Sequence, residues 1–186
     1  MNNNKKLVII TGPSGVGKGT VLNELLKMNR KLWISISATT RNPRKGEIDG
    51  EHYYFLSRNK FKEMISEDLF IEWAQFADNY YGTPLKSVKE KIKDGFQVLL
   101  EIEVKGASQI KKKLPDSISI FILPPSKDEL ERRIRKRATD NEDSILKRLK
   151  RAEFEINSAQ NFDYVVKNES VEKTAEMISE IIKIQN

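Results

Sequence analysis

LVIITGPSGVGKGT, residues 7–20, sets the architecture of this 186-residue chain. The apolar run from Lys6 to Thr11 is typical of a strand that is covered on both faces in a parallel sheet. A glycine-rich turn follows it, and residues 18–28 then place their apolar side chains on one helical face. This order of strand, turn and helix is the context in which phosphate-binding loops occur.

The turn also has the spacing of such a loop, with Gly12, Gly17 and Lys18 in the required positions. Glycines let successive backbone N–H groups turn toward phosphate oxygens, the helix start adds partial positive charge, and the lysine adds a full one. A plain glycine turn is the alternative, which the lysine and its flanks disfavour. We expect nucleotide phosphates to be bound by Gly12, Pro13, Ser14, Gly15, Val16, Gly17, Lys18, Gly19 and Thr20.

Gly19 departs from the pattern, which has a serine or threonine there to hold magnesium. Two explanations are open. Either the site has lost catalysis and the domain only binds, or Mg²⁺ is held largely by the phosphates and by water, which this ion readily retains. Thr20, one residue later, is the possible protein ligand.

Strand and helix patterns alternate along most of the chain, which predicts an α/β fold with a doubly wound parallel sheet. Thr83 and Pro84 are interpreted as an N-cap and first helical residue, and Ser126 as a second N-cap. Strands are expected at residues 6–11, 32–37, 96–102, 117–123 and 164–167. Helices are expected at residues 18–28, 85–94, 104–114, from 127, from 141 or 144 to about 157, and at 171–184.

Closely spaced aromatic and β-branched runs interrupt this alternation between residues 39 and 84, which predicts a small, mainly β insertion. A second, shorter excursion at residues 126–148 predicts a helical lid. The core is then expected to consist of residues 1–38, 85–125 and 149–186.

Composition is that of an ordinary globular protein, with 38% hydrophobic and 32% charged residues. No apolar run approaches the roughly 18 residues of a membrane span, and the short apolar stretch near the start does not fit a signal peptide. The chain has no cysteine and one histidine, which excludes disulfides and thiolate zinc sites. We expect a cytoplasmic location and no membrane partner.

Net charge is +6, and four units of that surplus fall between Lys127 and Arg151. A pair of solvated, charge-laced helices is the simple interpretation. A nucleic-acid surface is less favoured, because acidic residues are interleaved and no aromatic residues accompany the arginines as stacking platforms. A mobile arginine-bearing flap over a polyphosphate is the third hypothesis.

Two arginines and two tyrosines mark the polar stretch from Ser37 to Phe55. Arg41 and Arg44 are separated by Pro43, which restricts the backbone, and tyrosines follow at 53 and 54. Guanidinium forks with phenolic hydroxyls suit a dianionic phosphate monoester.

Glu72 lies in an aromatic-rich predicted strand, where an uncompensated carboxylate would be costly. It therefore requires a partner. Guanine would satisfy both carboxylate oxygens, because its N1–H stands beside a 2-amino group, whereas adenine lacks this pair of donors. A neighbouring lysine or arginine is the alternative partner.

Together these motifs resemble those of the guanylate kinases, over essentially the whole length of the chain. The matching segments are GPSGVGKGT, SATTRNPRKGEIDGEHYYF, FIEWAQFADNYYGTP, VLLEIEVKGA, FILPPS, RRIRKRATDNEDSILKRL and YVVKN. The resemblance implies a P-loop NTPase-type fold in which residues 39–84 form a GMP-binding insertion.

The resemblance also implies roles for individual residues. Catalysis is assigned to Lys18, Arg41, Arg137 and Arg148, with the last two in the lid. ATP contacts beyond the phosphate loop are assigned to Arg133, Arg137 and Asn168. GMP contacts are assigned to Ser37, Arg41, Arg44, Tyr53, Glu72, Tyr81, Gly82, Thr83, Glu101 and Glu103. This sequence departs from the family pattern at Glu101 and Glu103, where many members have aspartate, and at Thr83, where many have serine.

The implied reaction is reversible, Mg²⁺-dependent transfer of the γ-phosphate of ATP to GMP or dGMP, giving ADP and GDP. It needs no nucleophilic side chain, so catalysis consists mostly of positioning and charge stabilisation. The main alternative is an inactive module of the same family that binds a phosphorylated peptide. A kinase for another nucleoside monophosphate and a nucleic-acid binder are further alternatives, and a homo-oligomer is possible.

Overall fold

The computed structural model describes residues 6–76, 78–136 and 142–185. The strands are β1 (Leu7–Thr11), β2 (Leu32–Ile34), β3 (Ala38–Thr39), β4 (Tyr54–Phe55), β5 (Phe70–Phe76), β6 (Asn79–Pro84), β7 (Gln97–Glu101), β8 (Ile118–Leu123) and β9 (Tyr164–Lys167). The helices are α1 (Lys18–Met28), α2 (Arg58–Ser66), α3 (Leu85–Lys93), α4 (Val104–Lys113), α5 (Lys127–Lys136), α6 (Glu142–Asn157), α7 (Val171–Ile184) and the short 3₁₀ turn η2 (Ala159–Asn161).

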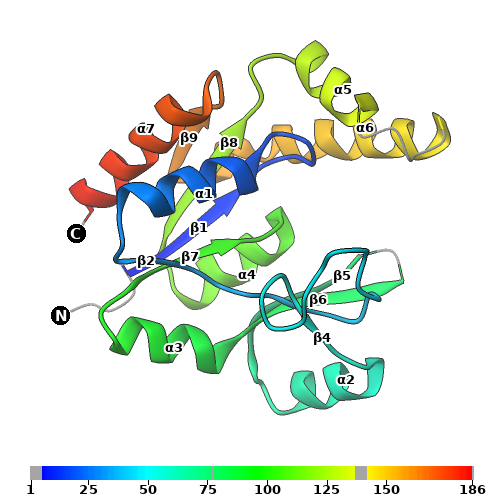
Figure 1. Ribbon diagram of the computed structural model, residues 1–186, viewed down its shortest axis with the longest axis vertical. Helices are drawn as coiled ribbons and strands as arrows, with labels where there is room; N and C mark the ends of the chain where they lie inside the picture. The colour runs from blue at the N-terminus through cyan, green and yellow to red at the C-terminus, as the bar shows by residue number, and fades with distance from the viewer. Residues whose placement is uncertain (1–5, 77, 137–141, 186) are drawn as a thin grey trace.

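The core is a five-stranded sheet in the order β2-β7-β1-β8-β9, and every neighbouring pair is parallel. Figure 1 shows α1 and α7 over one face of this sheet and α3 and α4 over the other. The structure thus confirms the predicted α/β fold with a doubly wound parallel sheet.

Strand β1 explains why both faces are covered. All five of its residues are buried, and alternate side chains point to opposite faces. Val8 and Ile10 pack in one apolar cluster with residues of α1 and α7. Leu7 and Ile9 pack in a second cluster with residues of α3 and α4. A continuous apolar run is therefore needed here, as the sequence indicated.

The second sheet has the order β4-β3-β6-β5 and lies within residues 38–84. The segment also contains α2, a helix that was not expected from the sequence. Phe61 of α2 is fully buried and stacks on Phe70 of β5, with ring centroids 4.4 Å apart. Phe61 packs with Ala38 and Phe70 in a small apolar core between α2 and the second sheet.

Two local expectations were wrong. The strand expected at residues 32–37 is shorter: β2 ends at Ile34 in the core sheet, and the next strand, β3, begins at Ala38 in the second sheet. Thr83 does not cap α3, whose N-cap is Pro84. The Thr83 hydroxyl instead donates to Glu72 on the neighbouring strand.

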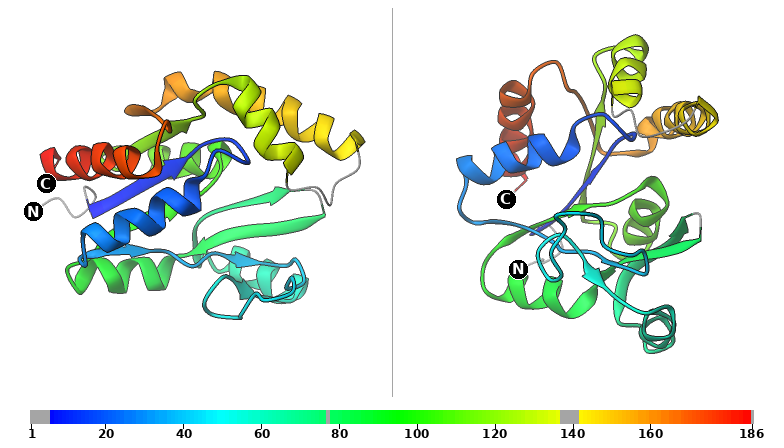
Figure 2. Two further views of the ribbon diagram at one scale, coloured as in Figure 1. Left: turned by 45° about the horizontal axis from the view of Figure 1, so that its top comes forward. Right: turned by 45° about the vertical axis from the view of Figure 1, so that its right-hand side comes forward.

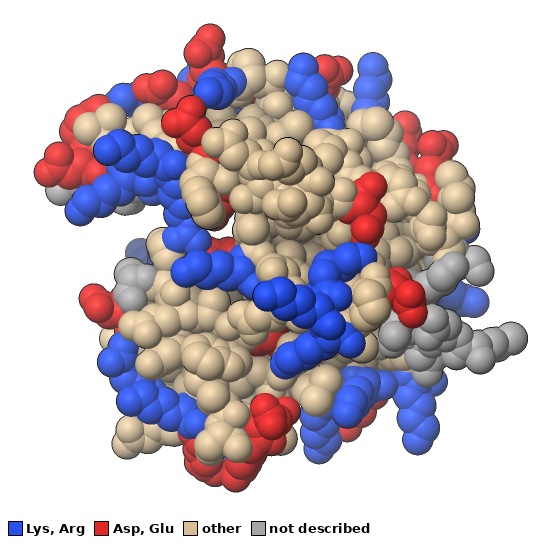
Figure 3. Space-filling model, turned by 180° about the vertical axis from the view of Figure 1, so that it is seen from behind, with Lys and Arg blue, Asp and Glu red and all other residues tan. Residues whose placement is uncertain are grey.

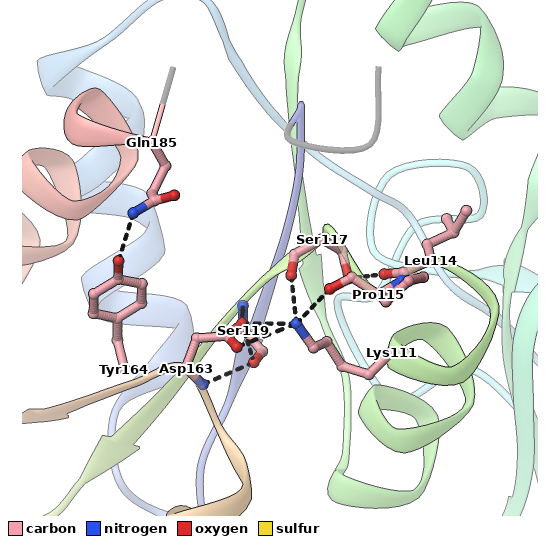
Figure 4. A network of polar contacts seen from close by, with 8 residues as sticks. All are labelled: Lys111, Leu114, Pro115, Ser117, Ser119, Asp163, Tyr164 and Gln185. Atoms are coloured by element: carbon pink, nitrogen blue, oxygen red, sulfur yellow. Dashed lines mark hydrogen bonds and ion pairs between the residues drawn. The ribbon is translucent and has the colours of Figure 1, made fainter. Parts of the chain in front are cut away.

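A polar network anchors the start of β9 (Figure 4). The Asp163 carboxylate accepts hydrogen bonds from the Ser119 backbone N–H at 2.8 Å and from its hydroxyl at 2.7 Å. The Lys111 ammonium lies 2.9 Å from Asp163 Oδ2 and also donates to the carbonyls of Pro115 and Ser117. One carboxylate therefore connects α4, β8 and the chain entering β9.

Helices α5 and α6 form a pair with a small apolar cluster of their own, which includes Leu130, Ile134 and Ile145. The Ser126 hydroxyl accepts from the Glu129 backbone N–H, which confirms the predicted cap of α5. Both views in Figure 2 place this pair on the same side of the core as the β5–β6 hairpin. No helix within the described ranges is long and apolar enough to cross a lipid bilayer.

Candidate active site

The phosphate loop occupies the carboxyl end of β1, between the strand and α1. Gly12 passes so close to β8 that a Cβ there would lie 2.5 Å from the Ile122 carbonyl oxygen. Gly15 and Gly17 have φ angles of 88° and 95°, which disfavour residues with a Cβ. Glycine is thus required at these positions for the tight turn.

Lys18 lies across this loop. Its ammonium donates to the carbonyl of Gly12 at 2.7 Å and to that of Pro13 at 3.4 Å. The positive charge is therefore held on the turn that the sequence assigns to nucleotide phosphates.

Side chains from distant parts of the chain fix the Val16 carbonyl at the bottom of the loop. Asn168 Nδ2 donates to it at 2.8 Å and Arg133 Nη1 donates at 3.2 Å. Asn168 is only 3% exposed, and its amide oxygen accepts from Thr174. Asn168 thus contacts the loop from within the protein, where it supports the loop backbone.

Of the two lid arginines assigned to catalysis, Arg148 lies in α6 and donates from Nη2 to the Ser14 hydroxyl at 2.9 Å. This contact brings α6 to the phosphate loop. The prediction for Arg137 lies outside the described residues.

Arg41 is held in a bidentate ion pair with Glu47, and both N···O distances are 2.9 Å. Glu47 Oε2 also accepts from the Arg44 backbone N–H at 2.7 Å. These contacts, led by the Arg41 hydrogen bond, lower the pKa of Glu47 to about 2. Glu47 therefore stays ionised and connects the two arginines. Glu47 was not among the residues expected at the site, although its position three residues after Arg44 was a possible signal.

Aromatic rings complete this arginine site. The Arg41 guanidinium carbon lies 5.4 Å from the centre of the Tyr53 ring, and the rings of Tyr53 and Tyr81 meet edge to face at 6.3 Å. Arg44 is exposed. Arg41, Tyr53 and Tyr81 thus lie together, and the Arg44 backbone is connected to Arg41 through Glu47.

Glu72 is 5% exposed, and its Oε1 accepts from the Thr83 hydroxyl at 2.7 Å. Burial raises its pKa to about 7, against the opposing effect of the hydrogen bonds from Thr83. Its other oxygen faces α4, where a Cβ on Gly106 would lie 2.4 Å from Oε2. Among the described residues, no lysine or arginine forms an ion pair with Glu72, the alternative that the sequence left open.

The remaining acceptor-side residues frame this carboxylate. Gly82 is buried and pairs with Ala38 on one side and Trp73 on the other. Ser37 precedes β3, and its carbonyl accepts from the Tyr54 backbone N–H at 2.9 Å. Gly82 thus lies in β6 next to Thr83, and Ser37 lies just before β3, the strand that pairs with β6.

Glu101 ends β7, where it pairs with Ile10 just before the phosphate loop. It keeps solvent contact, yet the surrounding protein desolvates its carboxylate and raises its pKa, while the Lys18 ammonium opposes that rise. Glu103 precedes α4 and forms an ion pair with Arg151 at 2.6 Å. Arg151 was not among the residues expected at the site.

Gly19 and Thr20 are exposed at the start of α1, and a Cβ on Gly19 would have no heavy atom within 4 Å. Within the described ranges, no three His, Cys, Asp or Glu side chains converge in a way that could hold a metal ion. Thr20 and Glu101 are both exposed near the loop, and their hydroxyl and carboxylate supply oxygen donors there.

The space-filling view in Figure 3 shows the molecule hollowed between the α5–α6 pair and the part that contains the second sheet, with lysines and arginines gathered beside the hollow. Positive potential in such a depression raises the local concentration of anions.

The comparisons with known proteins agree with one another. The family model described as guanylate kinase matches residues 4–185. A guanylate kinase from Prochlorococcus marinus (strain MIT 9312) is 62% identical, with 98% of this chain and all of that protein covered. One from Trichormus variabilis is 52% identical over 93% of this chain and 87% of its own length. The crystal structure of guanylate kinase from Anaplasma phagocytophilum superposes with a TM-score of 0.80 at 36% identity, covering 96% of this chain and 85% of that one.

Proposed function

The chain belongs to the guanylate kinase family and is an ATP:GMP phosphotransferase, and we propose that it transfers the γ-phosphate reversibly, with Mg²⁺, to GMP and dGMP through the residues described above. The curated relatives are named as kinases, which favours catalysis over the inactive module.

One relationship carries the proposal for the site. Strands β1 and β7 are neighbours, so the phosphate loop and the start of α4 stand at the same edge of the core sheet. The Glu72 carboxylate lies against Gly106 in the first turn of α4. Glu72 thereby lies near the edge of the core sheet that carries the phosphate loop, which supports a guanine site close to a polyphosphate site.

On the acceptor side, we propose that the Glu72 carboxylate accepts hydrogen bonds from the N1–H and 2-amino group of guanine. Arg41 and Arg44 bind the GMP phosphate together with the hydroxyls of Tyr53 and Tyr81. Thr83 holds Glu72 in position through its hydroxyl. Ser37, Gly82, Glu101 and Glu103 complete this side. Because guanidinium groups match phosphate oxygens in pairs, the arginines orient the attacking oxygen as well as neutralise it.

On the donor side, the loop amides and Lys18 hold the ATP phosphates, and Arg148 reaches the same loop through Ser14. A GMP phosphate oxygen attacks the γ-phosphorus in line, and the bond to the ADP oxygen breaks. Arg148 and Arg137 neutralise charge on the transferred group and help to exclude water, which would otherwise hydrolyse ATP. Arg133 and Asn168 keep the loop in shape.

The residues beside the loop fit Mg²⁺, which prefers oxygen ligands and retains several waters. Thr20 and Glu101 both keep solvent contact there, and we propose that they hold the ion directly or through water. The bound ion would neutralise phosphate charge during transfer.

A coupled assay of ATP consumption with GMP, dGMP, AMP, CMP and UMP in separate reactions tests the function. We expect rapid turnover with GMP and dGMP and little with the others, and dependence on Mg²⁺. Turnover with none of them would favour the inactive module, and turnover with AMP would refute the guanine assignment. The domain boundaries, cytoplasmic location, possible homo-oligomer and lack of nucleic-acid partners stay predictions.

A further inference from the structure

Helix α6 carries two arginines one turn apart, Arg148 and Arg151, which lie on the same face of the helix. Arg148 contacts the phosphate loop through Ser14. Arg151 extends toward the acceptor side, where it contacts Glu103 and Phe76. The same helix thus reaches both halves of the site.

The contacts of Arg151 are short and involve three segments of the chain. Its Nη2 lies 2.6 Å from Glu103 Oε2, and its Nε donates to Glu155 Oε1 at 2.9 Å. Its guanidinium carbon stands 3.9 Å from the centre of the Phe76 ring. A guanidinium that stacks on a ring while it binds two carboxylates is fixed in orientation, unlike a lysine ammonium.

Phe76 is at the far end of β5 and pairs with Asn79 of β6, so it marks the tip of the hairpin. The same hairpin carries Glu72, Tyr81 and Thr83, all assigned to the acceptor. Its middle is already attached to α4, because the Gln109 side chain bonds both backbone groups of Trp73. Arg151 adds an attachment at the tip, from α6.

We infer that Arg151 is a positioning residue for the acceptor: by holding Phe76 and Glu103 against α6, it sets the place of the guanine-binding hairpin relative to the phosphate loop. This inference rests on the proposed function. Phe76 is 43% exposed, and besides Arg151 its ring lies against that of Tyr81 in the same hairpin, with ring centroids 6.5 Å apart.

Steady-state kinetics of Arg151→Gln and Phe76→Leu test the inference, with Lys150→Ala as the matched control that removes an exposed positive charge from α6. We expect each test variant to raise the KM for GMP about tenfold while kcat and the KM for ATP change less than about twofold. Because Glu155 is buried, Arg151→Gln can also reduce stability, whereas Phe76→Leu leaves that carboxylate paired.

The double variant provides a second criterion. Both substitutions remove the same contact, the one between Arg151 and Phe76. The KM of the double variant for GMP should therefore not exceed that of the more impaired single variant by more than about twofold. An unchanged KM for GMP in both single variants, fully additive effects, or an equal loss in kcat and in ATP binding would overturn the inference.

Hydrogen exchange separates the inference from the proposed function. Backbone amides of β5 and β6 should exchange faster in Arg151→Gln than in Lys150→Ala without any nucleotide. If the native chain fails to turn over GMP, the proposed function is wrong, and this measurement still decides the contact: unchanged exchange in the hairpin would refute it.

Discussion

The Thr83 hydroxyl donates a hydrogen bond of 2.7 Å to the buried carboxylate of Glu72, across the antiparallel strands β5 and β6. The bond occupies one side of one carboxylate oxygen, and each ionised oxygen has two acceptor positions. The carboxylate is thus fixed in orientation and still able to accept from two N–H groups of a purine.

Replacement of Glu72 by glutamine tests that role. The amide NH₂ would face one of the guanine donors, so one hydrogen bond is lost and a donor stands against a donor. We expect a cost of about 1–3 kcal/mol, which is roughly a 5- to 150-fold rise in the KM for GMP. The KM for ATP should stay unchanged, and Glu67→Gln at the exposed end of α2 is the control. Equal GMP affinity in Glu72→Gln would exclude the guanine assignment.

GMP affinity should depend on pH through the same carboxylate. Burial raises the pKa of Glu72 to about 7 from 4.5, so the folded protein binds more protons than the unfolded chain between these values. The contribution of Glu72 to the free energy of unfolding therefore falls as pH rises from 4.5 to about 7. Guanine donors favour the ionised form, so GMP binding should strengthen as pH rises through about 7.

GMP titrates through its own phosphate, and comparison with Glu72→Gln removes that contribution. The ratio of the variant Kd to the native Kd should increase from about pH 5 to about pH 8. Calorimetric titration in buffers of different ionisation enthalpy should also show proton release on GMP binding near neutral pH. A ratio that is constant with pH would contradict a neutral Glu72 in the free protein.

Gly106 leaves the space in which the Glu72 carboxylate lies. A Cβ at this position would stand 2.4 Å from Oε2, so Gly106→Ala must displace the carboxylate or α4. We expect an increase in the KM for GMP of roughly tenfold or more, with the KM for ATP nearly unchanged. Ser108→Ala, at an exposed position of the same helix, is the control and should behave like the native protein. Normal GMP kinetics in Gly106→Ala would show that the helix adapts without moving Glu72.

How well the sequence predicted each element depended on how local its determinants are. Helices α1 and α7 begin and end where their apolar periodicity does, and the Ser170 hydroxyl caps α7 within its own segment. Helix α2 escaped prediction because Phe61 is its only fully buried residue, so it lacks a long apolar stripe. Its Ser57 cap alone was too weak a signal.

The site shows the same limit. Spacing alone located Lys18 and the loop glycines, because a phosphate loop is contiguous in sequence. Thr83 was misinterpreted as a cap since its real partner, Glu72, is on another strand and becomes its neighbour only when β5 and β6 pair. Arg151 was missed for a similar reason, because its contacts with Glu103 and Phe76 span long separations in sequence.

The contacts of Asp163 predict that replacing this residue lowers the stability of the fold without affecting catalysis. Although partial burial opposes it, the hydrogen bonds from Ser119 and Lys111 lower the pKa of Asp163 below its usual value. Asp163→Asn should cost about 1–2 kcal/mol and lower Tm by about 2–8 °C, while kcat at 25 °C is retained. Asp94→Asn is the control, since its nearest ammonium, on Lys91, is 4.0 Å away. An unchanged Tm in Asp163→Asn would show that the network in Figure 4 adds little to folding.

Gly19 lacks the hydroxyl that the usual pattern places beside magnesium, and Gly19→Ser tests whether that absence matters. The position is exposed, and an added Cβ would meet nothing within 4 Å, so the variant should fold normally. If phosphates, water and Thr20 already hold the ion, the new hydroxyl should lower the Mg²⁺ concentration for half-maximal rate by no more than about tenfold, with kcat changed less than about twofold. Thr20→Val is the companion variant, and it should raise that concentration. If the native protein showed no turnover and Gly19→Ser did, glycine at this position would disable the loop.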